Sequence, residues 1–355
     1  MKLIAKISIL LAATCFMVAS CEPADEPEGP DIVVPPTPEP GPEPTPKPDP
    51  TPEPEPNPEP EPNPDPTPTP GPDPTPGTSL YPWAELPVMY DADRNGVHDN
   101  DPNLYYATHF TDLKSPTGGA ARNYTVCFSG EHHCPVWVAA PRHQMYQVKG
   151  VEKRTNAYKR DPKIPADIQY NSKSTGGNCN KGHMLGSAER VASKTTNEQV
   201  FYYSNIAPQL SSGFNTGGGG WNILEEFVDG QVCSDTLYVV IGCYFDKFTD
   251  GYGESASPKT ITFGGRNDVD MPTMFYYALL RTKKGNSGKS VRNCSASEIQ
   301  CAAFVRTHTN SLKGQRVSSK EMMSISDLEK LTGIRYFENV PNAPKTSFKA
   351  SEWGL

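Results

Sequence analysis

The sequence predicts an α+β fold with a central, mainly antiparallel sheet, preceded by a disordered proline-rich stalk. Most of the 38 prolines lie between residues 22 and 77, so that stretch differs in composition from the rest of the chain. Residues 79–355 contain several short β-branched and aromatic runs but few segments with helical signals. A region of that length can bury one sizeable core, or form two small domains at most.

The N-terminal residues 1–20 have the parts of an export signal. Lys2 and Lys6 supply the charged start, and the apolar stretch 7–18 that follows is too short for a membrane-spanning helix. The residues Val-Ala-Ser before Cys21 resemble the lipobox of bacterial lipoproteins. That resemblance implies a lipid on Cys21 and a protein anchored in the bacterial cell envelope, at the outer membrane or the cell surface. A plain signal peptide with an accidental cysteine is the alternative.

Residues 21–78 form an acidic linker built from units such as Pro-Glu-Pro-Asn-Pro. Proline removes backbone donors and favours polyproline II, and like charges repel, so this tract cannot build a core. We interpret it as a stalk. At roughly 3.1 Å per residue, it would reach more than about 100 Å from the anchor. A proline-rich ligand for a partner is the alternative interpretation.

The net charge of −8 combines two opposite contributions. Residues 22–78 contain 14 Asp and Glu against one lysine, Lys47, whereas Lys2 and Lys6 belong to the export signal. The remainder, residues 79–355, therefore carries a charge of +3. A mildly basic surface fits a polyanionic substrate, although charge alone does not identify one.

Five runs in the second part of the chain have the composition of strands. The longest, Leu-Tyr-Val-Val-Ile-Gly-Cys-Tyr-Phe, is continuous and apolar, as expected of a buried central strand. The first two are joined near Gly130. In chain order, the predicted strands are 123–128, 136–140, 237–245, 260–263 and 274–281.

Two helices are predicted, at residues 221–228 and 326–332. In the second, Ser326 and Glu329 have the spacing of a capping box, and Gly333 lies where a helix should stop.

Seven cysteines remain after Cys15 and Cys21, and an exported protein can form disulfides. Short spacings suggest three pairs and leave Cys179 over: Cys127–Cys134, Cys233–Cys243 and Cys294–Cys301. One group could alternatively bind zinc, although exposed histidines at a hairpin tip explain it as well: Cys127, His132, His133 and Cys134.

Residues suited to catalysis occur in three ordered stretches. His183 follows a lysine and a glycine, and its ordinary pKa near 6.5 suits a general base. Asn205 and Asn215 offer neutral oxygen ligands, which suit Mg²⁺ because that ion prefers oxygen donors and keeps most of its waters. Glu225 lies ten residues beyond Asn215, so a helix can bring its carboxylate back toward metal-bound water.

Together these stretches resemble the DNA/RNA non-specific endonuclease family, which is of the ββα-metal type and includes mitochondrial endonuclease G. The family motif Asp-Arg-Gly-His appears here as Asn-Lys-Gly-His at residues 180–183. Residues 205–209 are similar to the family's Asn-Ile-x-Pro-Gln. A third segment is similar to Asn…Trp-x-x-Leu-Glu, through Asn215, Trp221, Leu224 and Glu225. The resemblance covers most of residues 100–340.

The resemblance implies a mechanism and a set of roles. His183 would act as general base on a water, Asn215 would hold one Mg²⁺ (or Mn²⁺ in its place), and Glu225 would orient metal-bound water. Lys181 stands where the family often has arginine and would offset charge at the phosphorus. A further cation would come from Arg160 or Arg154, between which the sequence does not decide. Asn205 completes the expected catalytic set.

The same resemblance implies DNA and RNA as substrates and products with 5′-phosphate ends. Little sequence selectivity is expected, because the contacts go to phosphate rather than to base edges. Both sugars are accepted if no group monitors the 2′-hydroxyl. No obligate protein partner is evident, and the membrane is reached through the lipid on Cys21.

Three departures from the family pattern bear on these roles. Asn180-Lys181 replaces Asp-Arg, and lysine lacks the two-pronged grip of arginine on phosphate. Gly186 replaces a common proline. The run Gly217–Gly220 lengthens the gap before Trp221, which leaves Asn222 as the alternative metal ligand. Two other functions stay open: an impaired nuclease fold that binds nucleic acid or glycan as a surface lipoprotein, and a stalked adhesin-like protein without a site.

Overall fold

The computed structural model describes residues 83–87, 101–115, 118–148, 150 and 154–355. The expected signal peptide 1–20, the expected lipidation site Cys21 and the expected stalk up to residue 78 lie outside the described residues. Within the described part of the chain, no helix is both long enough and apolar enough to cross a membrane.

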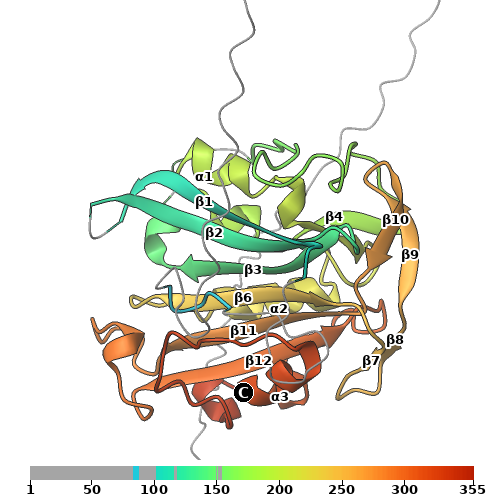
Figure 1. Ribbon diagram of the computed structural model, residues 1–355. Coiled ribbons are helices and arrows are strands. Elements are labelled where there is room, and N and C mark those ends of the chain that lie inside the picture. The colour runs from blue at the N-terminus through green and yellow to red at the C-terminus, as the bar shows by residue number, and fades with distance from the viewer. Residues whose placement is uncertain (1–82, 88–100, 116–117, 149, 151–153) are drawn as a thin grey trace, which may run out of the picture. The chain divides into compact units, whose positions relative to one another are not determined.

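A seven-stranded sheet forms the centre of the described region (Figure 1), and every neighbouring pair in it is antiparallel. The expected α+β class with a central antiparallel sheet is therefore confirmed. In spatial order the strands are β1 (Leu104–Lys114), β2 (Ala120–Ser129), β3 (Cys134–Arg142), β6 (Leu237–Tyr244), β11 (Met274–Thr282), β12 (Ile299–Thr307) and β13 (Met322–Met323).

Smaller elements lie around this sheet. Three two-stranded antiparallel sheets are formed by β4 (Cys179–His183) with β5 (Ile206–Leu210), β7 (Phe248–Thr249) with β8 (Ser255–Ala256), and β9 (Lys259–Phe263) with β10 (Arg266–Met271). We call the first of them the β4–β5 hairpin, although the connection between its strands contains α1. The α-helices are α1 (Lys194–Gln199), α2 (Gly220–Asp229) and α3 (Ile325–Thr332). All five predicted strands and both predicted helices are present.

The central strand β6 shows why the sheet is buried on both faces. Its side chains alternate, so that Val239 and Ile241 contribute to one apolar cluster and Val240 to another. The first cluster includes side chains from α2 and from the β4–β5 hairpin, whereas the second includes side chains from α3. A strand buried on both faces needs an uninterrupted apolar run, which is what the sequence shows there.

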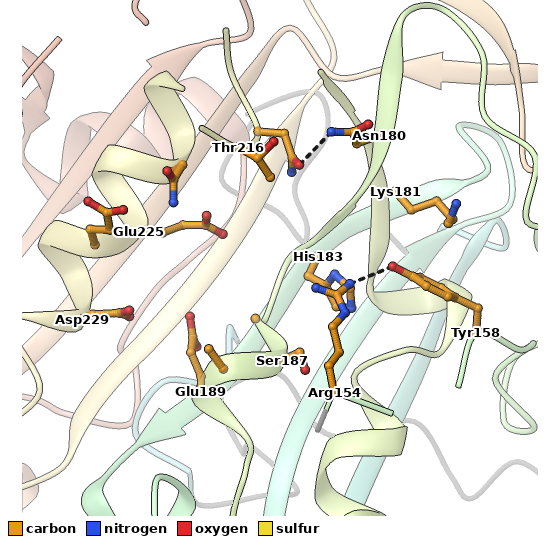
Figure 2. Close-up of a pocket in the computed structure, with 15 residues that line it drawn as sticks. Arg154, Tyr158, Asn180, Lys181, His183, Ser187, Glu189, Thr216, Glu225 and Asp229 are labelled. Carbon is orange, nitrogen blue, oxygen red and sulfur yellow. Dashed lines mark hydrogen bonds between the residues drawn. The ribbon is translucent and has the colours of Figure 1, made fainter. Parts of the chain in front are cut away.

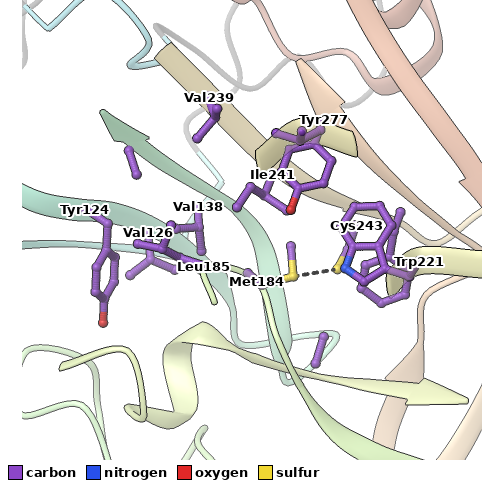
Figure 3. Close-up of a cluster of buried hydrophobic side chains, with 14 of the residues drawn as sticks. Tyr124, Val126, Val138, Met184, Leu185, Trp221, Val239, Ile241, Cys243 and Tyr277 are labelled. Carbon is purple, nitrogen blue, oxygen red and sulfur yellow. Dashed lines mark hydrogen bonds between the residues drawn. The ribbon is translucent and has the colours of Figure 1, made fainter. Parts of the chain in front are cut away.

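The cluster beneath the β4–β5 hairpin anchors the residues that follow it (Figure 3). Met184 and Leu185 are fully buried in this cluster, and the Met184 sulfur lies 3.6 Å from the sulfur of Cys243 on β6. On α2, Trp221 is also fully buried and stacks on Tyr277 of β11, with ring centroids 4.9 Å apart. Burial of each such large side chain stabilises the fold by roughly 2–3 kcal/mol, so both the hairpin and the helix are held firmly on the sheet.

The prediction for the start of α3 is wrong. The helix begins at Ile325, and its N-cap is Ser324, whose hydroxyl accepts a hydrogen bond from the Asp327 N–H. Ser326 cannot cap, because it already lies inside the first turn. The predicted stop is confirmed: Gly333 has φ +72° and closes the helix in the left-handed conformation.

The three predicted disulfides are also wrong, since all seven described cysteines are free thiols. Cys233 precedes strand β6, and Cys243 lies near the far end of the same strand. A strand extends by roughly 3.3 Å per residue, so most of the length of β6 separates the two cysteines. A disulfide instead requires Cα atoms about 4.4–6.8 Å apart. Close spacing in sequence is therefore misleading where the intervening residues form an extended strand.

The zinc alternative finds no support in the described part of the chain, which holds no group of three His, Cys, Asp or Glu residues able to bind a metal. The two histidines of the β2–β3 turn have other partners. His132 pairs with Asp270 at 2.9 Å, and the Nδ1 atom of His133 lies 2.9 Å from the Ile168 carbonyl oxygen. They fasten this turn to neighbouring segments.

Candidate active site

The β4–β5 hairpin sets the position of His183. The two strands pair antiparallel over five residues, with His183 opposite Ile206 and Gly182 opposite Ala207. Gly182 is required here, because a Cβ atom at this position would lie 2.1 Å from the side chain of Gln209. With helix α2 following in the chain, the hairpin completes the predicted ββα unit.

A cavity of about 510 Å³ lies between this hairpin and α2 (Figure 2). One side, which we call the strand wall, is formed by Arg154, Tyr158, Asn180, Lys181 and His183. The opposite side, the helix wall, is formed by Asn215, Asn222, Glu225, Glu226 and Asp229. The strand wall carries cations and the histidine, whereas the helix wall carries carboxylates and amides.

His183 is 8 % exposed and lines the cavity, with no hydrogen-bond partner for its Nε2 atom among the described residues. Its ring packs edge-on against Phe201, with centroids 4.8 Å apart, and is tilted against Tyr158. Burial, and then the nearby charge of Arg154, lowers the pKa of His183 from 6.5 to about 3. The imidazole is therefore neutral at physiological pH and has a lone pair to accept a proton, but a pKa this low makes it a weak base in these surroundings.

Two cations of the strand wall flank His183. The Lys181 ammonium donates to the Lys173 carbonyl at 3.0 Å and lies over the ring of Tyr158. The Arg154 guanidinium donates to the Tyr158 hydroxyl at 2.9 Å and lies over Phe201. Tyr158 therefore holds both cations at the cavity, a role that the sequence analysis missed.

Of the two candidate arginines, the structure places Arg154 at the cavity and Arg160 away from it. The Arg160 guanidinium is directed to the Tyr170 carbonyl, at 3.3 Å, and does not line the cavity. The structure therefore does not bring Arg160 to the cavity with the other candidates, and its catalytic role stays a prediction. Their position six residues apart in one irregular segment gave no basis for choosing between them.

Asn205 is likewise outside the cavity. It is fully buried, and its amide nitrogen donates to the carbonyls of Leu185 and Val200 while its oxygen accepts from the Leu185 N–H at 3.0 Å. All of these contacts go to backbone. In this structure the Asn205 side chain fixes the turn that follows His183, and its catalytic role stays a prediction.

Asn215 lines the cavity, and both ends of its amide have partners. Its nitrogen donates to the Gln209 side-chain oxygen, and its oxygen accepts from the Asn180 amide nitrogen at 3.1 Å. Its backbone N–H donates to the Leu210 carbonyl at 3.0 Å. Asn180, which replaces the family's aspartate, thus helps to orient the proposed metal ligand.

The glycine run forms a tight loop before α2 and does not break the helix. Gly217 and Gly218 have φ of +63° and +75°, which favours glycine. Gly219 is the N-cap residue, and a Cβ atom there would lie 2.4 Å from the Phe214 carbonyl oxygen. Asn215 therefore precedes the helix, and the Asn222 side chain accepts from the Gly218 N–H at 3.2 Å.

A distant histidine braces this loop. His308, at the end of β12, is 3 % exposed, and its Nε2 accepts from the Leu210 N–H at 2.8 Å while its Nδ1 lies 2.7 Å from the Pro272 carbonyl oxygen. Its ring also packs edge-on against Phe214, with centroids 4.5 Å apart. His308 therefore contacts the chain at two points just before Asn215. No sequence motif marks it.

The helix wall concentrates negative charge. Burial, followed by the charges of Glu189 and Asp229, raises the pKa of Glu225 well above its usual range. Arg142, on β3 and 1 % exposed, lies 3.3 Å from the Glu189 carboxylate and also pairs with Asp229. This buried arginine offsets part of the charge and was also missed in the sequence.

The donor atoms on the helix wall fit Mg²⁺. Asn215, Asn222 and Glu225 offer only oxygen as ligand atoms, which suits a hard cation that keeps several waters. Zinc prefers sulfur and imidazole nitrogen, which this wall does not offer. A divalent cation here would also compensate the uneven negative charge of the wall.

The fold and cavity define a nuclease-like ββα architecture. A model of the DNA/RNA non-specific endonuclease family matches residues 107–343, and this chain belongs to that family. It is 27 % identical over 202 residues to nuclease C1 of Cunninghamella echinulata var. echinulata, covering 54 % of this chain and 70 % of that protein.

Two mitochondrial relatives are more distant. The chain is 22 % identical to the mitochondrial nuclease of Saccharomyces cerevisiae, covering 62 % of this chain and 65 % of that protein. It is 25 % identical to human mitochondrial endonuclease G, covering 46 % of this chain and 54 % of that protein. A chain in the crystal structure of the EndoG/EndoGI complex is 21 % identical, with a TM-score of 0.49 and coverage of 61 % of this chain and 84 % of that chain.

Proposed function

We propose that this protein is a metal-dependent endonuclease that hydrolyses phosphodiester bonds of DNA and RNA with little sequence preference. The observation that carries the proposal is a cavity on the ββα unit, which brings His183 and Lys181 opposite Asn215 and Glu225. A histidine base and oxygen donors for a cation, set on opposite walls, match what in-line attack on a phosphodiester requires.

His183 takes a proton from the attacking water, since its neutral ring lines the cavity. Lys181 and Arg154 offset the negative charge on the phosphate, and Tyr158 keeps both cations in place. Attack by water at phosphorus with loss of the 3′-oxygen leaves 5′-phosphate ends. Contacts that go to phosphate carry no sequence information, so little base preference follows.

Asn215 would hold Mg²⁺, for which Mn²⁺ can substitute, and Glu225 would orient its waters from α2. When bound, such an ion stabilises negative charge on the leaving oxygen. Asn180 and Gln209 each form a hydrogen bond with the Asn215 amide, and these two bonds fix its orientation in the cavity.

We propose further that the protein is exported and anchored in the bacterial envelope by a lipid on Cys21. The lipobox-like sequence before this cysteine supports that assignment. The proline-rich residues 22–78 would then hold the nuclease domain away from the membrane.

The decisive experiment incubates the full chain with supercoiled plasmid and with RNA, with Mg²⁺ and after chelation. His183→Ala should lower the cleavage rate by about 100- to 10,000-fold. His132→Asn, in the β2–β3 turn, is the matched control and should cleave at the parent rate. Equal rates for the parent and His183→Ala would refute the role of His183. Binding of nucleic acid by the parent without cleavage would favour the impaired, binding-only alternative.

A further inference from the structure

A second cavity, of about 330 Å³, lies outside the active site and shares no lining residue with it. It is lined by residues from distant segments, including Trp83 near the start of the described chain, Arg122 on β2, Tyr238 on β6 and Arg292. We call it the Arg122 cavity. Its volume is within the range of small-molecule sites, which begins at roughly 300 Å³.

Arg122 is held rigidly in the wall of this cavity. It is 6 % exposed, donates to the Ala139 carbonyl at 2.9 Å, and pairs with the buried carboxylate of Glu85. The Arg122 guanidinium carbon lies over the Trp83 ring, 4.4 Å from the centroid of that ring. The Arg122 Nε atom is buried and has no hydrogen-bond partner among the described residues.

Arg292 supplies a second guanidinium to the same cavity, and among the described residues this one has no compensating carboxylate. Its Nη2 atom is buried and without a hydrogen-bond partner in the described part of the chain, where no ion pair includes it either. Because Glu85 balances Arg122, the charged pair adds nothing to the net charge, and Arg292 leaves the cavity positive. Buried donors without acceptors are costly, so an anion that reaches them is favoured.

The remaining lining suits the rest of a small organic anion. Thr236 and Ser290 offer hydroxyl groups, whereas Pro141 and Met145 offer apolar surface. The Trp83 ring adds an aromatic face. Cation, hydroxyl and apolar groups around one cavity match an anion that carries a polar linker and a planar ring.

We propose that the Arg122 cavity is a binding site for a small planar organic anion of the nucleoside monophosphate class. Arg292 binds the phosphate, and the hydroxyls of Thr236 and Ser290 contact the sugar. The apolar surface of Pro141 and Met145 holds the base. The site is separate from the proposed catalytic one, so this assignment does not depend on the nuclease activity.

The test measures binding of 2′-deoxyadenosine 5′-monophosphate to the full chain in the absence of divalent metal. Calorimetry gives the affinity, and tryptophan fluorescence reports contact at Trp83. Lys181→Ala is included throughout to remove phosphate binding at the active site. Arg292→Gln tests the site, and Arg316→Gln, which removes an exposed arginine outside the cavity, is its matched control.

The expected result is saturable binding that survives Lys181→Ala and Arg316→Gln and weakens at least tenfold in Arg292→Gln. Trp83→Phe should keep the affinity within about threefold but abolish the fluorescence change. Unchanged affinity in Arg292→Gln, or a fluorescence change that persists in Trp83→Phe, would overturn the location. Equal binding of inorganic phosphate would overturn the ligand class, as would equal binding of deoxyadenosine. Thermal unfolding of each variant shows that the fold is retained.

Discussion

The two walls of the active-site cavity are supported in different ways. On the strand wall, His183 and Lys181 sit in a regular ladder with β5, and the next residue, Met184, is buried in the core. On the helix wall, Asn215 lies in a glycine-rich loop that depends on His308, almost a hundred residues further along the chain. The base is thus positioned by its own ladder, whereas the loop that carries the proposed metal ligand also depends on a remote contact, in addition to the hydrogen bonds of Asn215 to Asn180 and Gln209. Changes in the two walls should therefore have separable effects.

After the loss of His183, the largest effect should come from the metal ligand itself. Asn215→Ala removes the proposed ligand and should lower kcat/KM at fixed Mg²⁺ by about 100-fold. Asn222→Ala removes only the side chain that accepts from Gly218 and should lower it by about threefold. Plasmid-nicking kinetics at several Mg²⁺ concentrations would measure both. The reverse order of effects would move the metal ligand to Asn222.

Acid should destabilise the protein through two buried histidines, His183 in the strand wall and His308 next to the Asn215 loop. Burial lowers the pKa of His183 to about 3 and the pKa of His308 to about 4, both from 6.5. Between about pH 4 and 6.5 the unfolded chain therefore binds more protons than the folded one, so the free energy of unfolding falls as pH falls. Each histidine contributes a slope of about 1.4 kcal/mol per pH unit in that range.

Urea unfolding at a series of pH values would measure this slope. His308→Gln removes one of the two groups, so its free energy of unfolding should depend less steeply on pH than that of the parent by about 1.4 kcal/mol per unit. His132→Asn is the control for loss of a half-buried histidine. If the free energy of unfolding had the same pH dependence in the parent and in His308→Gln, His308 would be protonated equally in the folded and unfolded states.

The brace at His308 should also govern the metal requirement. His308→Gln keeps a polar side chain near Leu210 but changes the geometry of the contact, so the Asn215 loop is held less well. The Mg²⁺ concentration for half-maximal activity should rise about tenfold, while kcat at saturating Mg²⁺ stays within about threefold. A purely structural role would lower activity without moving the metal dependence, and that result would contradict positioning by His308.

Much of the fold could be predicted from the sequence because its signals are local. The continuous apolar run of β6 and the Trp221–Glu225 segment of α2 were both placed correctly. The cap of α3 was missed by two residues, since Ser324 and Ser326 are equally good candidates until the first turn is seen. Local signals also failed for the cysteines, because pairing is a property of three-dimensional distance.

The site was predictable only in part, because some of its residues belong to local sequence motifs and others act through contacts across the fold. His183, Lys181, Asn215 and Glu225 belong to ordered motifs, and the structure brings all four to one cavity. Asn205 belongs to a motif too, but in this structure its side chain binds backbone. His308 and Arg142 belong to none and act through contacts made across the fold, which one sequence does not reveal.

The smallest effect should come from restoring arginine on the strand wall. Lys181 is a point charge, and its ammonium already donates to the Lys173 carbonyl. Lys181→Arg offers a planar fork that can keep that contact, stack on Tyr158 and still grip phosphate with two N–H groups. We expect kcat/KM to rise about threefold with an unchanged Mg²⁺ requirement, because the helix wall is untouched. Lys173→Arg, which alters a neighbouring lysine outside the cavity lining, is the matched control. A shift in the Mg²⁺ requirement of Lys181→Arg would show that the two walls are coupled, and their separate support would then not translate into separate function.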